Sequence, residues 1–203
     1  MRLCKYILAL IILSSCCLPL LAQPADYLVL TSGDTLYGQV QFLAPPASDR
    51  VYLKKISLIT SNQKTKFRLK EISAIHSNST TYRLFRLENK VALPNPFREY
   101  FHLNGNEGQL YVLKLIQQGQ LSHYEWQWKE QGESTLTSTD LFIKSNDDYF
   151  IRATQGLLGL KRKALADYFT DCPELVRLLQ EKQLNTPAQV VNFYNRQCSS
   201  LPN

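Results

Sequence analysis

The chain lacks the residue patterns that mark most metal centres and enzyme active sites. Its three histidines are far apart, and none belongs to an H-E-x-x-H or Cys/His ligand pattern. No G-x-S-x-G segment exposes a catalytic serine, and no C-x-x-C pair offers redox chemistry. We therefore expect no metal ion, no cofactor and no catalytic residue of these kinds. The histidines are His76, His102 and His123.

The acidic residues are weak candidates for catalysis. Asp147 and Asp148 lie in the segment SNDDYF, where a turn between strands explains them, and they lack the alternating acids and the glycine of a calcium loop. A pair such as Glu125 with Asp140 has the chemistry of a glycosidase, but a sequence does not show the separation of two carboxylates. We leave enzymatic activity open and favour a non-catalytic protein.

The first 22 residues predict export. Arg2 and Lys5 form a basic head, residues 6–21 are apolar apart from two serines, and Ala22 is the small residue that a signal peptidase requires. The short apolar run disfavours an uncleaved anchor. A second alternative is a lipoprotein signal that ends at Cys16, where acyl chains would hold the protein on a membrane surface.

Positive charge exceeds negative charge, but not in the pattern of a nucleic-acid-binding protein. The net charge is +6, from 23 basic and 17 acidic residues. Nucleic-acid binding needs a concentrated basic stripe with stacking aromatic rings, and the basic residues here are dispersed along the chain. We expect a solvated surface and no nucleic-acid partner. The basic groups include Lys54-Lys55, Lys64, Lys66, Arg68, Lys70 and Lys161-Arg162-Lys163.

Residues 27–154 have the pattern of successive β-strands. β-Branched and aromatic residues are dense, and Gly, Asn, Asp and Ser interrupt them at short intervals. This spacing predicts an antiparallel barrel or sandwich, and the break at Leu93-Pro94-Asn95-Pro96 suggests two β subdomains. We predict a signal peptide at 1–22, a small β-barrel-like subdomain at 23–92, a second antiparallel β region at 93–156 and C-terminal helices at 157–203.

Residues 157–203 have helical patterns and contain both cysteines that follow the signal. Helices are predicted over KRKALADYF, from Cys172-Pro173-Glu174 to near Leu184, and from the capping box Thr186-Pro187-Ala188-Gln189. Cys172 precedes one arm of a helix hairpin and Cys198 follows the other, so arms of similar length bring them together. In an oxidising compartment we predict a Cys172–Cys198 disulfide, with two separate thiols as the alternative.

The segment TSGDTLYGQV, residues 31–40, has two interpretations. A phosphate-binding loop needs a glycine-rich turn that runs into a helix. Residues 35–42 alternate instead, with Leu36, Val40 and Phe42 on one face, which predicts a strand. We interpret Ser32-Gly33-Asp34 as a hairpin turn and place Gly38 on the inner face, where a missing side chain permits a bend or a close strand approach.

Tyr124, Trp126 and Trp128 form a candidate ligand platform. They occupy alternate positions of one predicted strand and therefore share a sheet face. Exposed aromatic rings in a row stack on sugar rings or grip an apolar ligand, whereas a buried row belongs to a core. The opposite face of the strand is polar, which is typical of a half-buried strand, so we favour the core interpretation.

Four landmarks occur in order: GDTLYG at 33–38, GQLY at 108–111, YFTDCPEL at 168–175, and Tyr194-Asn195 followed by Cys198. Together they resemble an uncharacterised family of exported proteins from Gram-negative bacteria. That resemblance implies an exported location and implies no mechanism. Residues 28–75 separately resemble SH3-like and Sm-like small β-barrels, through a GD-x-aliphatic-x-G hairpin and the closing segment LKEISAI; such barrels serve many functions.

These features predict an exported envelope protein that is mainly β with a C-terminal α-helical region. We expect it in the periplasm or outside the cell, or on the outer membrane if Cys16 is lipidated, and we expect membrane contact only in that case. The leading hypothesis is a non-catalytic module that binds an envelope protein or a surface polymer. The alternatives are a polysaccharide hydrolase with a carboxylate pair and a structural subunit of an envelope assembly.

Overall fold

A computed structural model describes residues 26–42, 55–91, 99–105, 107–129, 136–156 and 159–198. The predicted signal peptide, Cys16 and the break around Pro94 lie outside these residues. Within them, no helix has the length and apolar character needed to cross a bilayer.

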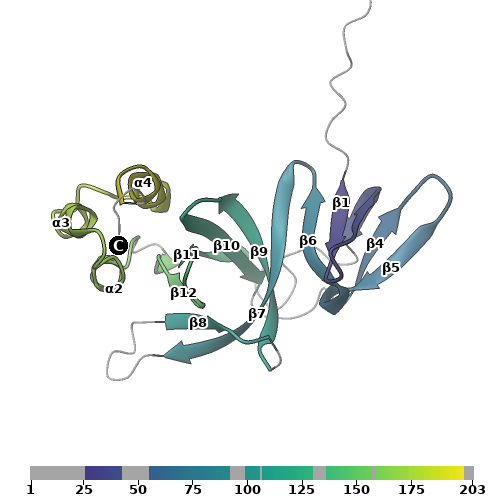
Figure 1. The fold of residues 1–203 in the computed structure, drawn as a ribbon, viewed down its shortest axis with the longest axis horizontal. Helices are drawn as coiled ribbons and strands as arrows, with labels where there is room; N and C mark the ends of the chain where they lie inside the picture. The colour runs from purple at the N-terminus through teal and green to yellow at the C-terminus, as the bar shows by residue number, and fades with distance from the viewer. Residues whose placement is uncertain are drawn as a thin grey trace, which may run out of the picture.

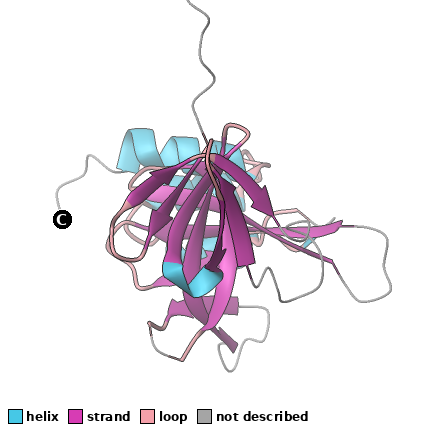
Figure 2. Ribbon diagram, turned by 90° about the vertical axis from the view of Figure 1, so that its right-hand side faces the viewer, coloured by secondary structure: helices cyan, strands magenta, loops and turns pink. Residues whose placement is uncertain are grey.

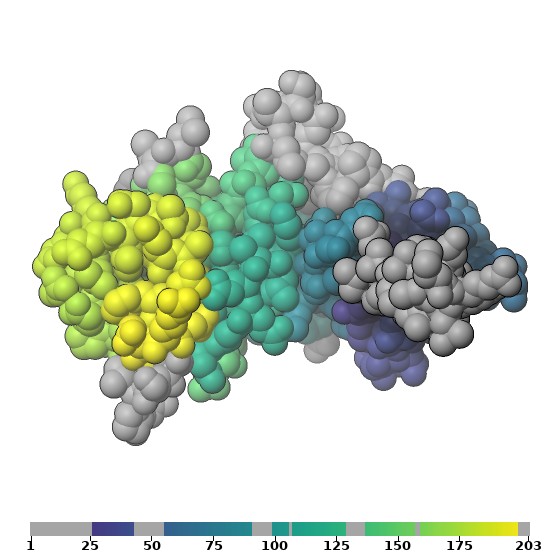
Figure 3. Space-filling model, turned by 90° about the horizontal axis from the view of Figure 1, so that it is seen from above, coloured from purple at the N-terminus to yellow at the C-terminus, as the bar shows by residue number. Residues whose placement is uncertain are grey.

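Three parts follow one another along the molecule. Short N-terminal strands lie at one end, long central strands lie in the middle, and the helices lie at the other end (Figure 1). The space-filling view from above shows the same order, from purple through teal to yellow (Figure 3). The strands pair antiparallel and three helices follow them, so the predicted fold class, mainly β with a C-terminal α-helical region, is confirmed.

The N-terminal part consists of a three-stranded sheet and the first strands of the nine-stranded sheet. They pack around one apolar cluster that includes Leu28, Ile56 and Ile75, all of them fully buried. The result is a small β-barrel-like unit of the kind that the resemblance predicts. One sheet consists of β3 (Gln39–Phe42), β4 (Lys55–Ile59) and β5 (Lys64–Arg68); a 3-10 turn, η1 (Leu69–Glu71), leads to β6 (Ile72–Ser77), which pairs with β1 (Tyr27–Leu30) and, through it, β2 (Thr35–Tyr37).

The long strand β7 (Thr80–Val91) joins this unit to a second barrel. Its first half pairs with β6 on one edge and β9 on the other, because Tyr82 and Arg83 have partners in both strands. Its second half pairs with β8, and the sheet continues through β12, β11, β10 and β9 back to β7, which closes a six-stranded barrel. These strands are β8 (Glu99–Leu103), β9 (Gln109–Gln117), β10 (Leu121–Lys129), β11 (Leu136–Lys144) and β12 (Tyr149–Arg152).

The helices cover the outer face of the barrel beside β10, β11 and β12. Leu121, Phe142 and Ile151 point outward from these strands and form one apolar cluster with buried residues of the helices. Viewed from the end that carries β4 and β5, the strands and the short η1 turn lie in front and the C-terminal helices lie behind them (Figure 2). The helices are α2 (Arg162–Tyr168), α3 (Pro173–Gln180) and α4 (Pro187–Phe193), which continues into a π-helical turn at Tyr194–Cys198.

The starts of α3 and α4 and the disulfide agree with the predictions from the sequence. Pro173 begins α3, and the Thr186 side chain accepts a hydrogen bond from the Gln189 backbone amide in a capping box. Cys172 and Cys198 form the predicted disulfide, with their Cα atoms 5.6 Å apart. The bond ties the start of α3 to the end of the π-helical turn and therefore closes the helix hairpin.

Two predicted boundaries are wrong. Residues 35–42 are not one strand, because the chain divides at Gly38 into β2 and β3, which belong to different sheets. A Cβ atom on Gly38 would lie 2.6 Å from the carbonyl oxygen of Ile59, so the predicted bend and close approach are both present. α3 ends at Gln180 instead of near Leu184, because Lys182 takes a left-handed conformation (φ 58°) that stops the helix.

Candidate functional site

One end of the six-stranded barrel opens into a pocket of about 460 Å³. It forms where β7, β10 and β12 end and where β8 and β9 begin, so five strands contribute side chains to its wall. The volume is in the range of small-molecule sites, which are concave and combine aromatic side chains with a few polar groups. The lining residues are Asn89, Glu99, Phe101, Gln109, Tyr111, Trp126, Trp128 and Arg152.

Strand alternation places two of the three predicted platform residues in this pocket. Tyr124, Trp126 and Trp128 occupy alternate positions of β10 and therefore share one face of the strand. That face points into the barrel, where Tyr124 and Trp126 pack with the barrel core. Tyr124 lies deepest, is 2% exposed and belongs to the barrel core. Trp126 and Trp128 are nearer the open end, are half-buried and line the pocket. The row is therefore core at one end and pocket wall at the other.

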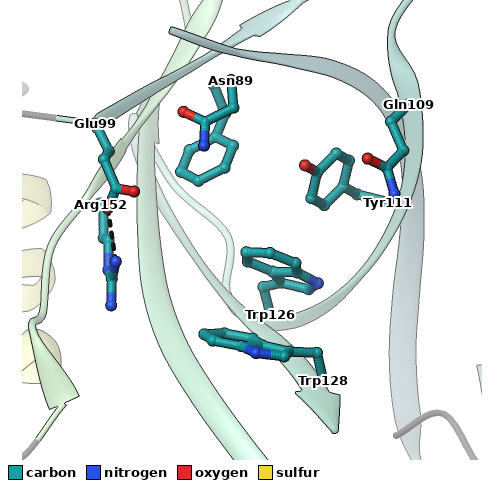
Figure 4. A pocket seen from close by; sticks show the side chains of 8 residues that line it. Asn89, Glu99, Gln109, Tyr111, Trp126, Trp128 and Arg152 are labelled. Carbon is teal, nitrogen blue, oxygen red and sulfur yellow. Dashed lines mark hydrogen bonds and ion pairs between the residues drawn. The ribbon is translucent and has the colours of Figure 1, made fainter. Parts of the chain in front are cut away.

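The aromatic wall is built from stacked and edge-on rings. Trp126 and Trp128 stack with their ring centres 4.4 Å apart and their planes at 28°. Tyr111 and Phe101 meet Trp126 edge-on at 5.0 and 6.0 Å, which fixes its position from the barrel interior. Figure 4 shows the two indole rings one above the other, with Tyr111 on one side of the pocket and the charged residues on the other. Trp126 therefore has ring contacts with Trp128, Tyr111 and Phe101.

The opposite wall carries an ion pair. The Arg152 guanidinium donates from Nη1 to Glu99 Oε2 at 2.6 Å, and Lys161 Nζ lies 3.4 Å from the same oxygen (Figure 4). Arg152 Nε also donates to Thr139 Oγ1 and to the Thr154 carbonyl oxygen, both at 3.0 Å. These two bonds from Nε hold the Arg152 guanidinium group in place. In the described residues, all of these bonds together leave Glu99 Oε1 and Arg152 Nη2 for a ligand.

The Glu99–Arg152 pair is expected to survive mild acidification. Burial raises the pKa of the Glu99 carboxyl, but hydrogen bonding and charge from Arg152, with Lys161, outweigh burial and hold the pKa below its ordinary value. A carboxylate whose pKa is lowered in the folded state stabilises the fold fully at pH values above its ordinary pKa of about 4.3. That stabilisation is lost as the pH falls through the pKa of the folded state.

Tryptophan emission during an acid titration measures this prediction. The chain has two tryptophans, and both line the pocket, so the emission reports on this site. We expect an emission change only below about pH 4.3, and we expect Glu99→Gln to abolish it. A wild-type transition near neutral pH that Glu99→Gln removes would show that the carboxylate titrates normally or higher, contrary to this prediction.

The carboxylates Glu125 and Asp140 lie outside the pocket. They face each other across β10 and β11 on the outer face of the barrel. Glu125 pairs with Lys114 at 3.6 Å, and Asp140 accepts bonds from Thr154 Oγ1 at 3.0 Å and contacts His123 Nε2 at 2.7 Å. His123 is 4% exposed and lies edge-on to Phe142, which packs against the helices. Both carboxylates thus have structural partners, and neither lines the pocket.

The other two histidines also have partners within the fold. His76 stacks on Tyr27 with ring centres 4.9 Å apart and contacts Thr81 Oγ1 at 3.0 Å. His102 lies against Tyr100 and Tyr149. In the part of the chain that the structure describes, no three His, Cys, Asp or Glu residues gather as metal ligands.

Sequence reasoning missed the charged residues of the pocket. Glu99 and Arg152 come from β8 and β12 and are 53 positions apart, so no local spacing connects them. A weaker signal was present within each strand. Each is two positions from a phenylalanine of the barrel core, Phe101 and Phe150, and therefore points inward with it. A charged residue in register with core residues is a signal for a pocket or a buried ion pair.

Comparisons of the chain with protein-family models, with curated protein sequences and with solved structures found no match. The chemistry of the pocket therefore carries the functional argument.

Proposed function

We propose that the protein is a non-catalytic binding protein that holds a sugar unit of a surface polymer at the open end of its barrel. The observation that carries the proposal is the stacked pair Trp126 and Trp128 facing the Glu99–Arg152 ion pair across one pocket. A sugar ring has apolar C–H faces that pack on aromatic rings and hydroxyl groups that need donors and acceptors. The two walls meet both needs.

The polar wall favours a sugar over a purely apolar ligand. Glu99 Oε1 is an acceptor and Arg152 Nη2 is a donor, and hydrogen bonds to charged groups are stronger than those between neutral groups. Asn89 adds an amide group to the pocket lining. An apolar ligand would cover these groups without replacing their bonds to water, which costs free energy for each unpaired group. Neighbouring hydroxyls of a sugar would bond to them.

The distribution of carboxylates supports binding over hydrolysis. Hydrolysis by a carboxylate pair requires two acids on opposite sides of one glycosidic bond. Among the described lining residues, Glu99 is the one acid, and its ion pair with Arg152 lowers its pKa, whereas a general acid needs a raised pKa. The disulfide supports an oxidising compartment, which agrees with the proposed export.

Trp128→Ala is expected to weaken sugar binding by about tenfold or more, because tryptophans in pockets are often the residues on which binding depends most. Trp126 remains in this variant as the reporter. Emission would be titrated with soluble oligosaccharides of neutral, N-acetylated and acidic types. Tyr37→Ala is the matched control, since Tyr37 is an aromatic residue that is 65% exposed and lies in β2, outside the pocket.

Three outcomes would contradict the proposal. One is the absence of a saturable emission change with all the oligosaccharides. Another is an equal loss of affinity in Tyr37→Ala. The third is a Trp126→Ala protein whose melting temperature is lowered but whose sugar affinity, measured by calorimetry, is unchanged. That result would make the aromatic row a core feature alone.

A further inference from the structure

A second surface, on the N-terminal unit, gathers positive charge that is dispersed in the sequence. Strand pairing places Lys55 of β4 directly opposite Arg68 of β5. Lys64, Lys66 and Arg68 occupy alternate positions of β5 and share one face, while Phe67 between them packs into the core. Lys70 follows in η1. All five cations are exposed, and we call them the basic face: Lys55, Lys64, Lys66, Arg68 and Lys70.

The basic face has no internal neutralisation. Strands β3, β4 and β5 contain no acidic residue, and the described residues form no ion pair with any of the five cations. Glu71 is the nearest acid along the chain, and its carboxylate accepts a bond from the Arg68 backbone amide. Elsewhere in the molecule, Lys114, Lys144 and Arg152 each have an acidic partner.

Protection of a sheet edge explains only part of this arrangement. β5 is at the edge of its three-stranded sheet, and lysines on edge strands prevent association between sheets. Lys55, however, lies on the central strand β4, where no edge needs protection. Like charges directly opposite each other destabilise an antiparallel pair, so the Lys55–Arg68 pairing has a cost to the fold. An anionic partner would turn that cost into binding energy.

We propose that the basic face binds an acidic linear polysaccharide. Side chains on one face of a strand are about 6.7 Å apart, so Lys64, Lys66 and Arg68 form a straight row that suits a polymer with regularly spaced negative groups. The outward residues of β5 include no aromatic ring, which single-stranded nucleic acids need for base stacking. They also include no large apolar side chain of the kind that inserts into a membrane surface.

The test compares two variants that lose the same charge. Lys64→Gln/Lys66→Gln/Arg68→Gln removes three cations from the basic face, and Lys163→Gln/Lys182→Gln/Arg196→Gln removes three exposed cations from the helical part. Fluorescence anisotropy with labelled alginate, at low ionic strength, measures the affinity. We expect the first variant to bind about tenfold more weakly, the control to change less than about twofold, and wild-type binding to weaken as salt is added. Circular dichroism checks that both variants fold.

The competing partners are arms of the same experiment. Labelled dextran, which is neutral, should not bind. Phosphatidylcholine vesicles with and without phosphatidylglycerol, and a single-stranded oligothymidylate, should bind more weakly than alginate. The proposal is overturned if the control variant loses as much affinity as the first variant, if dextran binds equally, or if vesicles or the oligothymidylate bind more tightly. Trp128→Ala separates this proposal from the one for the pocket, because we expect this variant to bind alginate through the basic face as wild type does.

Discussion

Replacing Cys172 and Cys198 together by alanine is expected to lower the free energy of unfolding by about 3 kcal/mol. The two cysteines are 26 positions apart, and their bond restricts the unfolded chain over that length. Both are also buried, at 3% and 7% exposure, so the loss of packing acts in the same direction. Urea unfolding followed by circular dichroism measures the change, with oxidised wild type as the reference.

Reduced wild type is the matched control for this prediction, because it keeps both sulfur atoms and loses only the bond. It should lose most of the stability that the double variant loses. The pocket should be unaffected below the unfolding transition, since the helices pack on the outer face of the barrel and Trp126 and Trp128 point inward. If reduced and oxidised wild type unfold at the same urea concentration, the disulfide contributes nothing to stability.

Local patterns predicted most of the secondary structure, and pairing between distant strands determined the rest. The helix hairpin could be predicted because Pro173, the Thr186 capping box and the two cysteines are local signals. β8 lies within the predicted β region at 93–156, but its five residues follow a proline-containing break and are too few to show clear alternation of their own. The elements therefore followed from the sequence where their signals are local, whereas the pairing of distant strands did not.

The candidate site could not be predicted from the sequence, because closure of the barrel brings its residues together. The sequence placed Trp126 and Trp128 on one face but did not show whether that face was filled or open. The polar face of the same strand was also misleading, since His123 is buried beside Phe142 of the cluster under the helices. The basic face is a similar case: Lys55 and Arg68 are 13 positions apart in the sequence and lie side by side in the sheet. Each of these arrangements is a product of strand register, which residue type alone does not determine.

Gly38→Val is expected to destabilise the fold by about 3 kcal/mol or more, since it combines backbone strain with overpacking. Gly38 has a φ of 155°, and a Cβ atom there would lie 2.6 Å from the Ile59 carbonyl oxygen and 3.2 Å from Leu58 Cγ. The carbonyl belongs to the β3–β4 pairing and cannot move without breaking the small sheet. Thermal unfolding measures the loss.

Gly33→Ala separates strain from collision in the same unit. Gly33 also has a positive φ, 96°, but nothing lies within 4 Å of its added Cβ atom. It should therefore lower the free energy of unfolding only through backbone strain, by about 1–2 kcal/mol, and the further loss in Gly38→Val belongs to overpacking against Ile59 and Leu58. Because Gly38 lies in the N-terminal unit, any Gly38→Val protein that folds should titrate with sugar as wild type does. A variant with normal stability and a silent pocket would instead place Gly38 in the binding site and contradict its assignment as a structural bend.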